Sequence, residues 1–413
     1  MDGVPSALPD GHAAPADGSL PESARSGLGR RPFGVYVHVP FCATRCGYCD
    51  FNTYTAAELT SSPASPRSWL EGLRRELDLA AAVLGTPPPA DTVFVGGGTP
   101  SLLGDAGLTE VLDAVRASFG LAEDAEVTTE SNPESTSPAF FDGIRGAGYT
   151  RVSLGMQSAA PHVLAVLDRT HTPGRAAAAA HEARAAGFEH VNLDLIYGTP
   201  GETPADLAAS LDAVLAAGVD HVSAYALIVE EGTALARRIA RGDLPEPDDD
   251  VLAARYEQVD TALSAVGLHW YEVSNWAAGP AAWCRHNLGY WHGADWWGAG
   301  PGAHSHVGGV RWWNVKHPAS YARALAEGRS PAAARELLTD ADRHLERVML
   351  ELRLVDGLVV DALTPAAREE AQALAAEGLL DRPALAGVDG RFGRCVLTPR
   401  GRLLADAVVR RLT

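Results

Sequence analysis

Three cysteines in one short loop are the residues of this sequence best suited to chemistry. Cys42, Cys46 and Cys49 follow the apolar run GVYVHV, residues 34–39, in a C-x3-C-x2-C spacing. Three thiolates can hold three irons of a [4Fe–4S] cluster, and the fourth iron then has no protein ligand. Electron-transfer ferredoxins normally supply four cysteines. The spacing therefore predicts a cluster whose open iron binds a small molecule.

Two other interpretations of the three cysteines use common protein chemistry. A disulfide would leave one of them unpaired, and five cysteines in 413 residues do not make a secreted disulfide framework. A Cys3His zinc site stays open, because His38 lies just upstream and could be the fourth ligand. A motif is a hypothesis that needs structural context, and the rest of the chain supplies that context.

Short runs rich in β-branched residues alternate with amphipathic segments from residue 34 onward. Apolar residues recur at helical spacing in stretches such as 68–84, 108–119 and 205–217. The runs typical of strands are 34–39, 91–96, 126–131, 150–156, 190–196 and 221–228. Six strand–helix units in succession predict an α/β fold in which a parallel sheet curls into a partial (β/α)6 barrel. In parallel barrels the functional residues gather at the C-terminal ends of the strands.

Glycines and polar side chains follow the expected strands at these ends. The segment GGGTP, residues 96–100, can bring backbone groups close to a ligand, although an ordinary turn explains it equally well. It lacks the G-x-G-x-x-G pattern of dinucleotide sites. Glu130, Gln157 and Asp194 lie at or near strand ends, and Arg169 follows the fourth strand. Such side chains are often merely solvated, but together they could bind ammonium, hydroxyl and carboxylate groups of one ligand.

The order of these motifs resembles a known family. YVHVPFC, GGGTPSLL, ESNPE, SLGMQS and DLIYGTP match in sequence the coproporphyrinogen III dehydrogenase/HemW family of radical S-adenosylmethionine (SAM) proteins, over residues 34 to about 400. In that superfamily, SAM occupies the open iron. Matching positions imply SAM contacts at Tyr36, Tyr48, Gly97, Gly98, Thr99, Glu130, Gln157, Arg169 and Asp194. Members with two SAM sites would add Ala226 and His304.

Two features bring the sequence closer to the HemW branch of this family than to the dehydrogenase branch. The dehydrogenases carry a fourth cysteine where this sequence has Phe51, and a structured segment before the first strand that the polar leader here could hardly replace. The segment CRHNLGYW, residues 284–291, resembles the HNxxYW segment associated with heme binding in HemW proteins. This implies heme contacts at His286, Asn287, Tyr290 and Trp291, where an imidazole can ligate iron and aromatic rings can cover the porphyrin. The alternative is a packed loop with a core histidine.

Composition divides the chain into four expected parts. Residues 1–32 are rich in Pro, Gly, Ala and Ser without periodicity, which predicts a disordered extension. We expect the barrel at 33–275, a connecting segment with the HNLGYW loop at 276–330, and an α+β module resembling a winged helix at 331–413. Acidic and basic residues nearly balance in this last part, which favours a docking or lid role over groove recognition of DNA.

Charge and hydropathy limit the partners. The net charge is −18 and no long Lys/Arg run offers a footprint for nucleic acid. There is no stretch of about 18 uninterrupted apolar residues, which argues against a membrane span, and the N-terminus lacks a signal-peptide pattern. We therefore expect a cytoplasmic protein that binds no nucleic acid. The resemblance implies heme and a heme-accepting protein, such as a membrane-associated respiratory protein, as partners, and it is compatible with a homodimer.

These observations predict a heme chaperone of the HemW type, which binds a [4Fe–4S] cluster, SAM and heme and transfers heme to acceptor proteins. The first alternative is an oxygen-independent coproporphyrinogen III dehydrogenase, a radical SAM enzyme that decarboxylates two propionates. The second is a zinc-stabilised binding module. Phe51 and His286 distinguish the first two hypotheses, and iron and sulfide analysis distinguishes the third.

Overall fold

The structure is a computed structural model that describes residues 11–60, 62, 64–387 and 393–413. Its centre is a mixed β-sheet with 13 strands within these residues. Six neighbouring strands are parallel and follow chain order, namely β2 (Phe33–Val39), β5 (Ala90–Gly97), β6 (Leu121–Ser131), β7 (Arg151–Gln157), β8 (His190–Tyr197) and β9 (His221–Ala226). Each overlaps a run expected to be a strand. The partial (β/α)6 barrel is confirmed.

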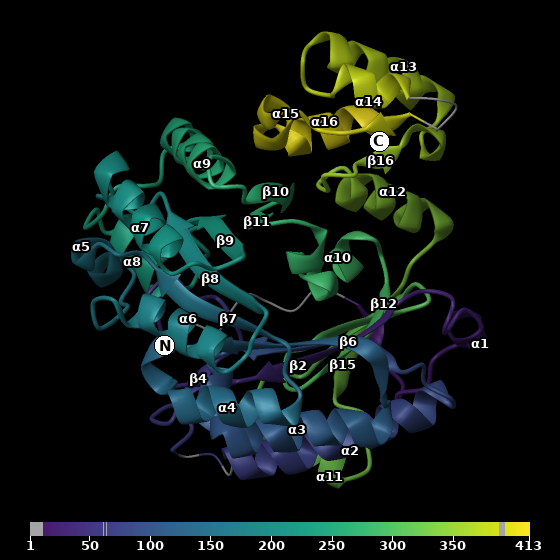
Figure 1. The fold of residues 1–413 in the computed structure, drawn as a ribbon. Helices are drawn as coiled ribbons and strands as arrows, with labels where there is room; N and C mark the ends of the chain where they lie inside the picture. The colour runs from purple at the N-terminus through teal and green to yellow at the C-terminus, as the bar shows by residue number, and fades with distance from the viewer. Residues whose placement is uncertain (1–10, 61, 63, 388–392) are drawn as a thin grey trace.

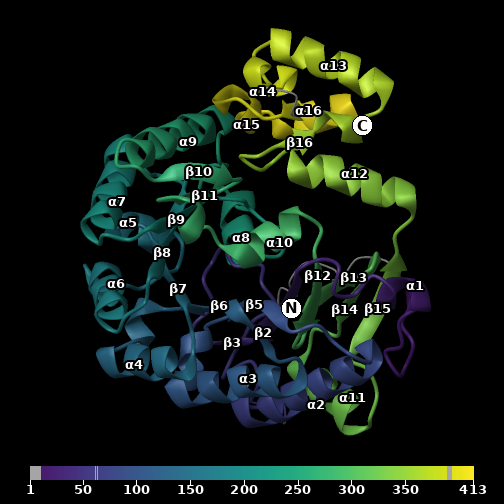
Figure 2. The ribbon, with the colours of Figure 1, turned by 45° about the vertical axis from the view of Figure 1, so that its right-hand side comes forward.

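Helices cover the outer side of the curved sheet, as Figures 1 and 2 show. In order along that side are α2 (Pro66–Leu84), α3 (Gly104–Ser118), α4 (Pro138–Ala147), α6 (Arg175–Ala185), α7 (Pro204–Ala216) and α9 (Asp249–Ser264). Local sequence explains α2, which begins with a capping serine, Ser65, followed by Pro66. Trp69, Leu73 and Leu77 recur at four-residue spacing and form its buried face.

Further strands extend the sheet at both edges, where β12 runs parallel to β2 and the strands beyond β12 and beyond β9 pair antiparallel. Next to β2 lies β12 (Asp295–Ala299), followed by β13 (His304–Val307), β14 (Val310–Asn314) and β15 (Ala332–Leu337). Next to β9 lie β11 (Asn275–Ala277) and β10 (His269–Glu272). Residues 276–330 were expected to be a connecting segment with the HNLGYW loop, and in the structure they also contribute β12, β13 and β14 to the sheet.

The leader is ordered in part. Residues 1–10 lie outside the described residues, but β1 (His12–Ala13) pairs with β15 at the sheet edge, and α1 (Glu22–Arg25) follows it. The backbone N–H of Ser330 also donates a 2.7 Å hydrogen bond to the carbonyl of Ala16. The expectation of disorder is wrong for these elements, because an edge strand supplies hydrogen bonds that the composition of the leader does not reveal.

The C-terminal residues form a small α+β module with an apolar core of its own (yellow-green to yellow in Figure 1). Its helices are α12 (Asp340–Glu351), α13 (Pro365–Ala376), α15 (Pro399–Leu403) and α16 (Ala405–Leu412). A two-stranded sheet joins β16 (Leu358–Val359) to β17 (Arg394–Cys395). Residues 388–392, between α13 and β17, lie outside the described residues.

Arg402 fastens this module to the barrel. Its guanidinium donates hydrogen bonds to the carboxylate of Asp260 at 3.0 Å and to the hydroxyl of Tyr256 at 3.0 Å, both on α9. It also lies 4.6 Å from the ring centre of Trp270 on β10. Charge-assisted hydrogen bonds and a cation–π contact act on one side chain. The module is therefore tied to the last helix and strand of the barrel.

Candidate functional site

The three cysteines lie in the loop that follows β2, at the C-terminal edge of the parallel strands. They are partly buried free thiols. The hydroxyl of Thr99 lies 3.7 Å from the sulfur of Cys42, and a guanidinium nitrogen of Arg169 lies 3.4 Å from the sulfur of Cys46. Burial raises the pKa of Cys49 to about 11. A metal ligated here must therefore displace a proton from that thiol.

The donor set suits an iron–sulfur cluster better than a zinc ion. Over the described part of the chain, no three Cys, His, Asp or Glu side chains converge on a single ion position. His38, the candidate fourth zinc ligand, uses both ring nitrogens, with the Tyr36 hydroxyl at 3.0 Å and the Asn52 carbonyl at 2.9 Å. A cluster needs only one thiolate for each iron. The residues present therefore fit a cluster held by three cysteines.

The glycines after β5 let the cysteine loop lie against the sheet. The N–H groups of Gly98 and Thr99 donate to the carbonyls of Val39 and Phe41, at 2.8 Å each. A Cβ atom on Gly98 would lie 2.5 Å from the Phe41 carbonyl oxygen. Gly97 has φ of 106°, which side-chain-bearing residues rarely adopt. The triplet thus seats the loop, and the N–H groups of Gly98 and Thr99 are already used within the protein.

Glu130 and Asp194 are two half-buried carboxylates that lack a cationic partner at hydrogen-bond distance in the described structure. Glu130 accepts the N–H of Gly97 at 2.9 Å, and Asp194 accepts the Ser153 hydroxyl at 3.0 Å and the Asn192 amide at 2.7 Å. Burial, together with the charge of Asp194, raises the pKa of Glu130 to about 8. Burial also raises the pKa of Asp194. A ligand bearing an ammonium group and hydroxyls would offset both effects.

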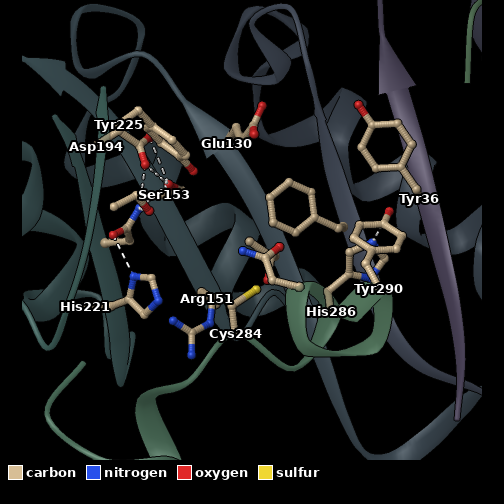
Figure 3. A pocket seen from close by; sticks show the side chains of 15 residues that line it. Tyr36, Glu130, Arg151, Ser153, Asp194, His221, Tyr225, Cys284, His286 and Tyr290 are labelled. Atoms are coloured by element: carbon tan, nitrogen blue, oxygen red, sulfur yellow. Dashed lines mark hydrogen bonds between the residues drawn. The ribbon is translucent and has the colours of Figure 1, made fainter. Parts of the chain in front are cut away.

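These carboxylates face a cavity of about 190 Å³ within the barrel, which we call the inner cavity (Figure 3). Glu130 and Asp194 lie toward one end of it in Figure 3, and Arg151 and Cys284 lie toward the other. Tyr36 also lines it. The inner cavity therefore has its two carboxylates near the C-terminal ends of the strands, and Arg151, which pairs with Glu126, deeper in the barrel.

A larger space of about 750 Å³, which we call the outer cleft, adjoins the inner cavity. Tyr36, Glu130 and Tyr290 line both. The other walls come from three parts of the chain. Phe51 and Asn52 belong to the cysteine loop, Gly302 to Arg311 to the β13–β14 region, and Met349 and Leu350 to α12. The C-terminal module thus forms one wall of a cleft that reaches the cysteine loop.

Backbone strain marks two positions of the expected SAM site. Gln157 at the end of β7 has φ of 60°, and Asp168, next to Arg169, has φ of 52°. They are the only non-glycine residues with positive φ among the described residues. Such conformations cost energy and cluster at functional sites.

Two other residues of the expected SAM site lie on different elements. Ala226 is the last residue of β9. Tyr48 lies in the cysteine loop, and burial raises the pKa of its hydroxyl.

The structure distributes the expected SAM residues over three neighbouring places. Tyr36, Glu130 and Asp194 line the inner cavity. Arg169 and Thr99 lie beside the cysteines, and Tyr48 is in the same loop. Gly97 and His304 line the outer cleft. The side chains meet around one region of the barrel, and their roles as SAM contacts stay predictions.

The HNLGYW segment forms α10 (Arg285–Trp291), which lies between the parallel strands and α12 (Figures 1 and 2). His286 is buried, and both of its ring nitrogens are bonded. Nδ1 lies 2.8 Å from the Thr92 hydroxyl, and Nε2 lies 2.8 Å from the Tyr290 hydroxyl. Burial lowers the pKa of His286 to about 3. The imidazole is thus a neutral, fully hydrogen-bonded core residue, as the alternative interpretation expected.

A buried ion pair that sequence reasoning missed holds α10 in place. Glu126 on β6 accepts the N–H groups of Arg285 at 3.1 Å and His286 at 3.0 Å. These are amides of the first turn, which have no partner within the helix. Glu126 also pairs with Arg151 at 3.2 Å. No local signal could have revealed this, because Glu126 and Arg285 are 159 residues apart in the chain.

Comparisons with known proteins agree with this geometry. Residues 36–214 match the Radical SAM superfamily. The chain is 64% identical to a protein named Heme chaperone HemW from Mycobacterium tuberculosis, over 92% of this chain and 95% of that protein. The chain belongs to the HemW family. It is also 32% identical to the Heme chaperone HemW of Bacillus subtilis, over 91% and 97% of the two chains.

A solved structure supports the fold of this HemW-family chain. Coproporphyrinogen III oxidase (HemN) of Escherichia coli, described as a radical SAM enzyme, superposes with a TM-score of 0.79 over 97% of this chain and 96% of that chain. Their sequence identity is 24%, so the likeness shows the fold alone. The family predicted from the cysteine loop and the ordered motifs is confirmed.

The remaining residues of the HemW-type HNLGYW segment are also engaged within the protein. The side chains of Asn287 and Trp291 hydrogen-bond Glu272, whose pKa burial raises to about 7. Tyr290 reaches both the inner cavity and the outer cleft.

None of the helices in the described residues is long and apolar enough to cross a membrane.

Proposed function

We propose that this protein is a heme chaperone, which holds a [4Fe–4S] cluster and SAM in the barrel, binds heme and passes it to an acceptor protein. The observation that carries the proposal is its similarity, over nearly the whole chain, to proteins named as heme chaperones. The loop geometry adds support. Phe51 occupies the position of the fourth cysteine of the dehydrogenases, and it is 57% exposed beside the outer cleft.

Cys42, Cys46 and Cys49 would hold the cluster. When bound, a cluster with SAM on its open iron supplies an electron that can cleave the sulfonium. Arg169 contacts this loop, because its guanidinium lies 3.4 Å from the sulfur of Cys46. Thr99 contacts the sulfur of Cys42. These two side chains thus lie against two of the three sulfurs of one partly buried loop.

Glu130 and Asp194 would orient SAM. Both are half-buried carboxylates, and a bound ammonium group would favour the ionised form of Glu130, whose pKa burial raises to about 8. Asp194 is held by Ser153 and Asn192, so its carboxylate has a fixed direction in which to accept hydroxyl groups. Tyr36 lines both cavities beside Glu130. The chain thus binds and orients the ligand with groups that are set before it arrives.

We place the protein in the cytoplasm, with heme and a heme-accepting protein as partners. The dehydrogenase alternative rests on a fold that HemN shares. The zinc alternative has lost its fourth ligand to the hydrogen bonds of His38. Neither has a specific observation in its favour.

The test is anaerobic reconstitution of the cluster, followed by incubation with SAM and reductant in two arms. One arm contains heme and the other contains coproporphyrinogen III. We expect one heme bound per chain, transfer of that heme to an apo-acceptor, and no protoporphyrinogen IX. Conversion of coproporphyrinogen III by the wild type would refute the chaperone proposal in favour of the enzyme. Zinc without sulfide in the purified protein would support the third hypothesis.

A further inference from the structure

We propose that His221 is a positioning residue, which fixes the Asp194 carboxylate for SAM and ties it to the start of α10, the helix of the HNLGYW segment. The inference rests on the proposed role of Asp194 in SAM binding. His221 is the first residue of β9 and is 2% exposed. It lines the inner cavity on the same side as Asp194, with hydrogen bonds leading from one to the other (Figure 3).

On one side, hydrogen bonds connect His221 to Asp194 through Asn192. The imidazole Nδ1 lies 2.8 Å from the amide oxygen of Asn192. The amide nitrogen of Asn192 lies 2.7 Å from a carboxylate oxygen of Asp194 and 2.6 Å from the Ser153 hydroxyl oxygen. That hydroxyl also donates to Asp194 at 3.0 Å. The carboxylate is thus held by two groups, one of which is itself held by His221.

On the other side, His221 is linked to the start of α10 through Tyr271 on β10. The imidazole Nε2 lies 2.8 Å from the Tyr271 hydroxyl, and the same hydroxyl accepts the N–H of Cys284 at 3.1 Å. Cys284 is the N-cap residue of α10. Tyr271 is fully buried, and its ring stacks on that of Trp283 with the centres 5.3 Å apart. Its hydroxyl therefore has a fixed position between the imidazole and the helix.

The partners determine which ring nitrogen of His221 carries the proton. A carboxylate only accepts hydrogen bonds, so the amide nitrogen of Asn192 must face Asp194 and its oxygen must face His221. Nδ1 is therefore the donor. Burial and the charge of Arg151 lower the pKa of His221, so the ring is neutral and Nε2 accepts the hydroxyl proton of Tyr271. Every link then donates toward Asp194, and hydrogen bonds in such a chain strengthen one another.

The chain gives Asp194 an anchor outside the inner cavity. Tyr271 is not among the residues that line this cavity, yet its hydroxyl is the donor for His221. A change at Tyr271 therefore reaches SAM through the protein and not by contact. Because the same hydroxyl holds the Cys284 amide, a displacement of α10 would remove a donor from the chain. The position of α10 and the binding of SAM are linked in this way, and such a link acts equally in both directions.

The test uses the full-length, cluster-loaded protein with ¹⁵N-labelled histidines, in which the signals missing from His221→Leu identify His221. We expect the wild type to carry the proton on Nδ1, and SAM to shift these signals. Tyr271→Phe keeps the ring and removes only the hydroxyl. It should shift the Nε2 signal of His221 and weaken SAM binding about 3- to 10-fold in equilibrium dialysis, which is the range expected for a change along such a network.

Tyr149→Phe is the matched control. Tyr149 is also fully buried, and its hydroxyl donates to the Leu108 carbonyl at 2.9 Å in the turn between α4 and β7. This variant also loses a buried hydrogen bond and should unfold at a lower urea concentration than the wild type, as Tyr271→Phe should. It should nevertheless leave the SAM affinity and the His221 signals unchanged, so a merely structural role of Tyr271 would make the two variants alike.

A proton on Nε2 of His221 in the wild type would overturn the inference, and so would equal SAM affinities of the two tyrosine variants. Asp194→Asn separates this inference from the proposed function. Weaker SAM binding in Asp194→Asn together with wild-type affinity in Tyr271→Phe would refute the positioning role alone. Unchanged SAM binding in Asp194→Asn would instead refute the proposed SAM site at this carboxylate, and the inference with it.

Discussion

The inner cavity and the outer cleft share a wall but differ in the chemistry that they can perform. The inner cavity is small, and ionisable side chains such as Glu130, Asp194 and Arg151 line it. The outer cleft is about four times larger in volume (750 against 190 Å³), and exposed apolar side chains such as Phe51 and Met349 line it. The inner cavity is thus suited to charged groups of a ligand, whereas the outer cleft is suited to a large apolar group.

The inner cavity and the outer cleft also differ in the contacts that hold their walls in place. Around the inner cavity, side chains hold one another through hydrogen bonds, and Glu126 links the strands to α10. Around the outer cleft, the walls come from the cysteine loop, the β13–β14 region and α12, which are joined by fewer contacts, such as the Asn52 amide on the Pro301 carbonyl and the Arg311–Glu346 ion pair. A mutation of the inner cavity should therefore affect stability and SAM together. A mutation of the outer cleft should affect large-ligand binding with little change in stability.

The largest effect is expected at the cysteine loop. Cys46→Ala should abolish bound iron and sulfide, because each thiolate holds a different iron. Cys284→Ala, which alters a thiol of the inner cavity, should keep the cluster at the wild-type level. Chemical iron and sulfide analysis after anaerobic reconstitution measures both. Full iron and sulfide in Cys46→Ala would show that the loop does not ligate the cluster.

A large loss of stability is expected from Arg151→Met. The change leaves Glu126 charged and without its 3.2 Å partner in a buried site, and breaking a buried pair in this way costs about 3–5 kcal/mol. Urea unfolding gives the free energy of unfolding. Arg67→Met removes a partner from an exposed ion pair and should change this energy by less than about 1 kcal/mol. Equal effects of the two variants would contradict the role given to Glu126 and Arg151.

A moderate effect is expected on SAM. Glu130→Gln and Asp194→Asn should each weaken SAM binding about 10- to 100-fold, because a lost charge-assisted contact costs about 1.5–3 kcal/mol. Glu123→Gln, at an exposed position near the start of β6, is the control. Equilibrium dialysis with labelled SAM on the cluster-loaded protein measures the affinity. Unchanged affinity in both variants would remove the inner cavity from the SAM site.

A further effect is expected in the pH dependence of stability. The pKa of Glu130 is raised to about 8 in the folded protein, whereas it is about 4.3 in an unfolded chain. Between these values the folded state binds the extra proton, so the contribution of Glu130 to the free energy of unfolding falls as pH rises. Glu130→Gln should therefore gain stability relative to the wild type from pH 5 to pH 8. A difference that stays constant across this window would contradict the raised pKa.

Local patterns were enough to predict the six parallel strands. The expected strand 34–39 and the observed β2 (Phe33–Val39) differ by only one residue. They agree because Val35, Val37 and Val39 are β-branched residues that are fully buried in the sheet. The added strands at the sheet edges were not predicted. Pairing of β1 with β15 joins residues more than 300 positions apart, and neither segment has a distinctive pattern of its own. Sequence periodicity reports burial, and it does not report which edge a short polar strand joins.

The candidate site was likewise predicted only in part from the sequence. Motif spacing located the cysteines and the strand-end residues, because chemistry requires particular side chains at those positions. It could not show that both nitrogens of His286 are engaged by Thr92 and Tyr290, because one of these partners is 194 residues away. For the same reason the sequence could not show that the ring of His304 on β13 lies against Trp313 on β14, because this contact depends on the pairing of the two strands.

The seating of the cysteine loop bears on the order of assembly. Gly98 and Thr99 hold the loop through backbone hydrogen bonds to Val39 and Phe41, and none of these contacts involves a cysteine sulfur. The loop can therefore take its position before any iron arrives. In this respect the protein differs from zinc fingers, which fold only when the metal binds. Folding of the chain and insertion of the iron–sulfur cluster can then be two separate steps, because the three thiols are already in position when the cluster is delivered.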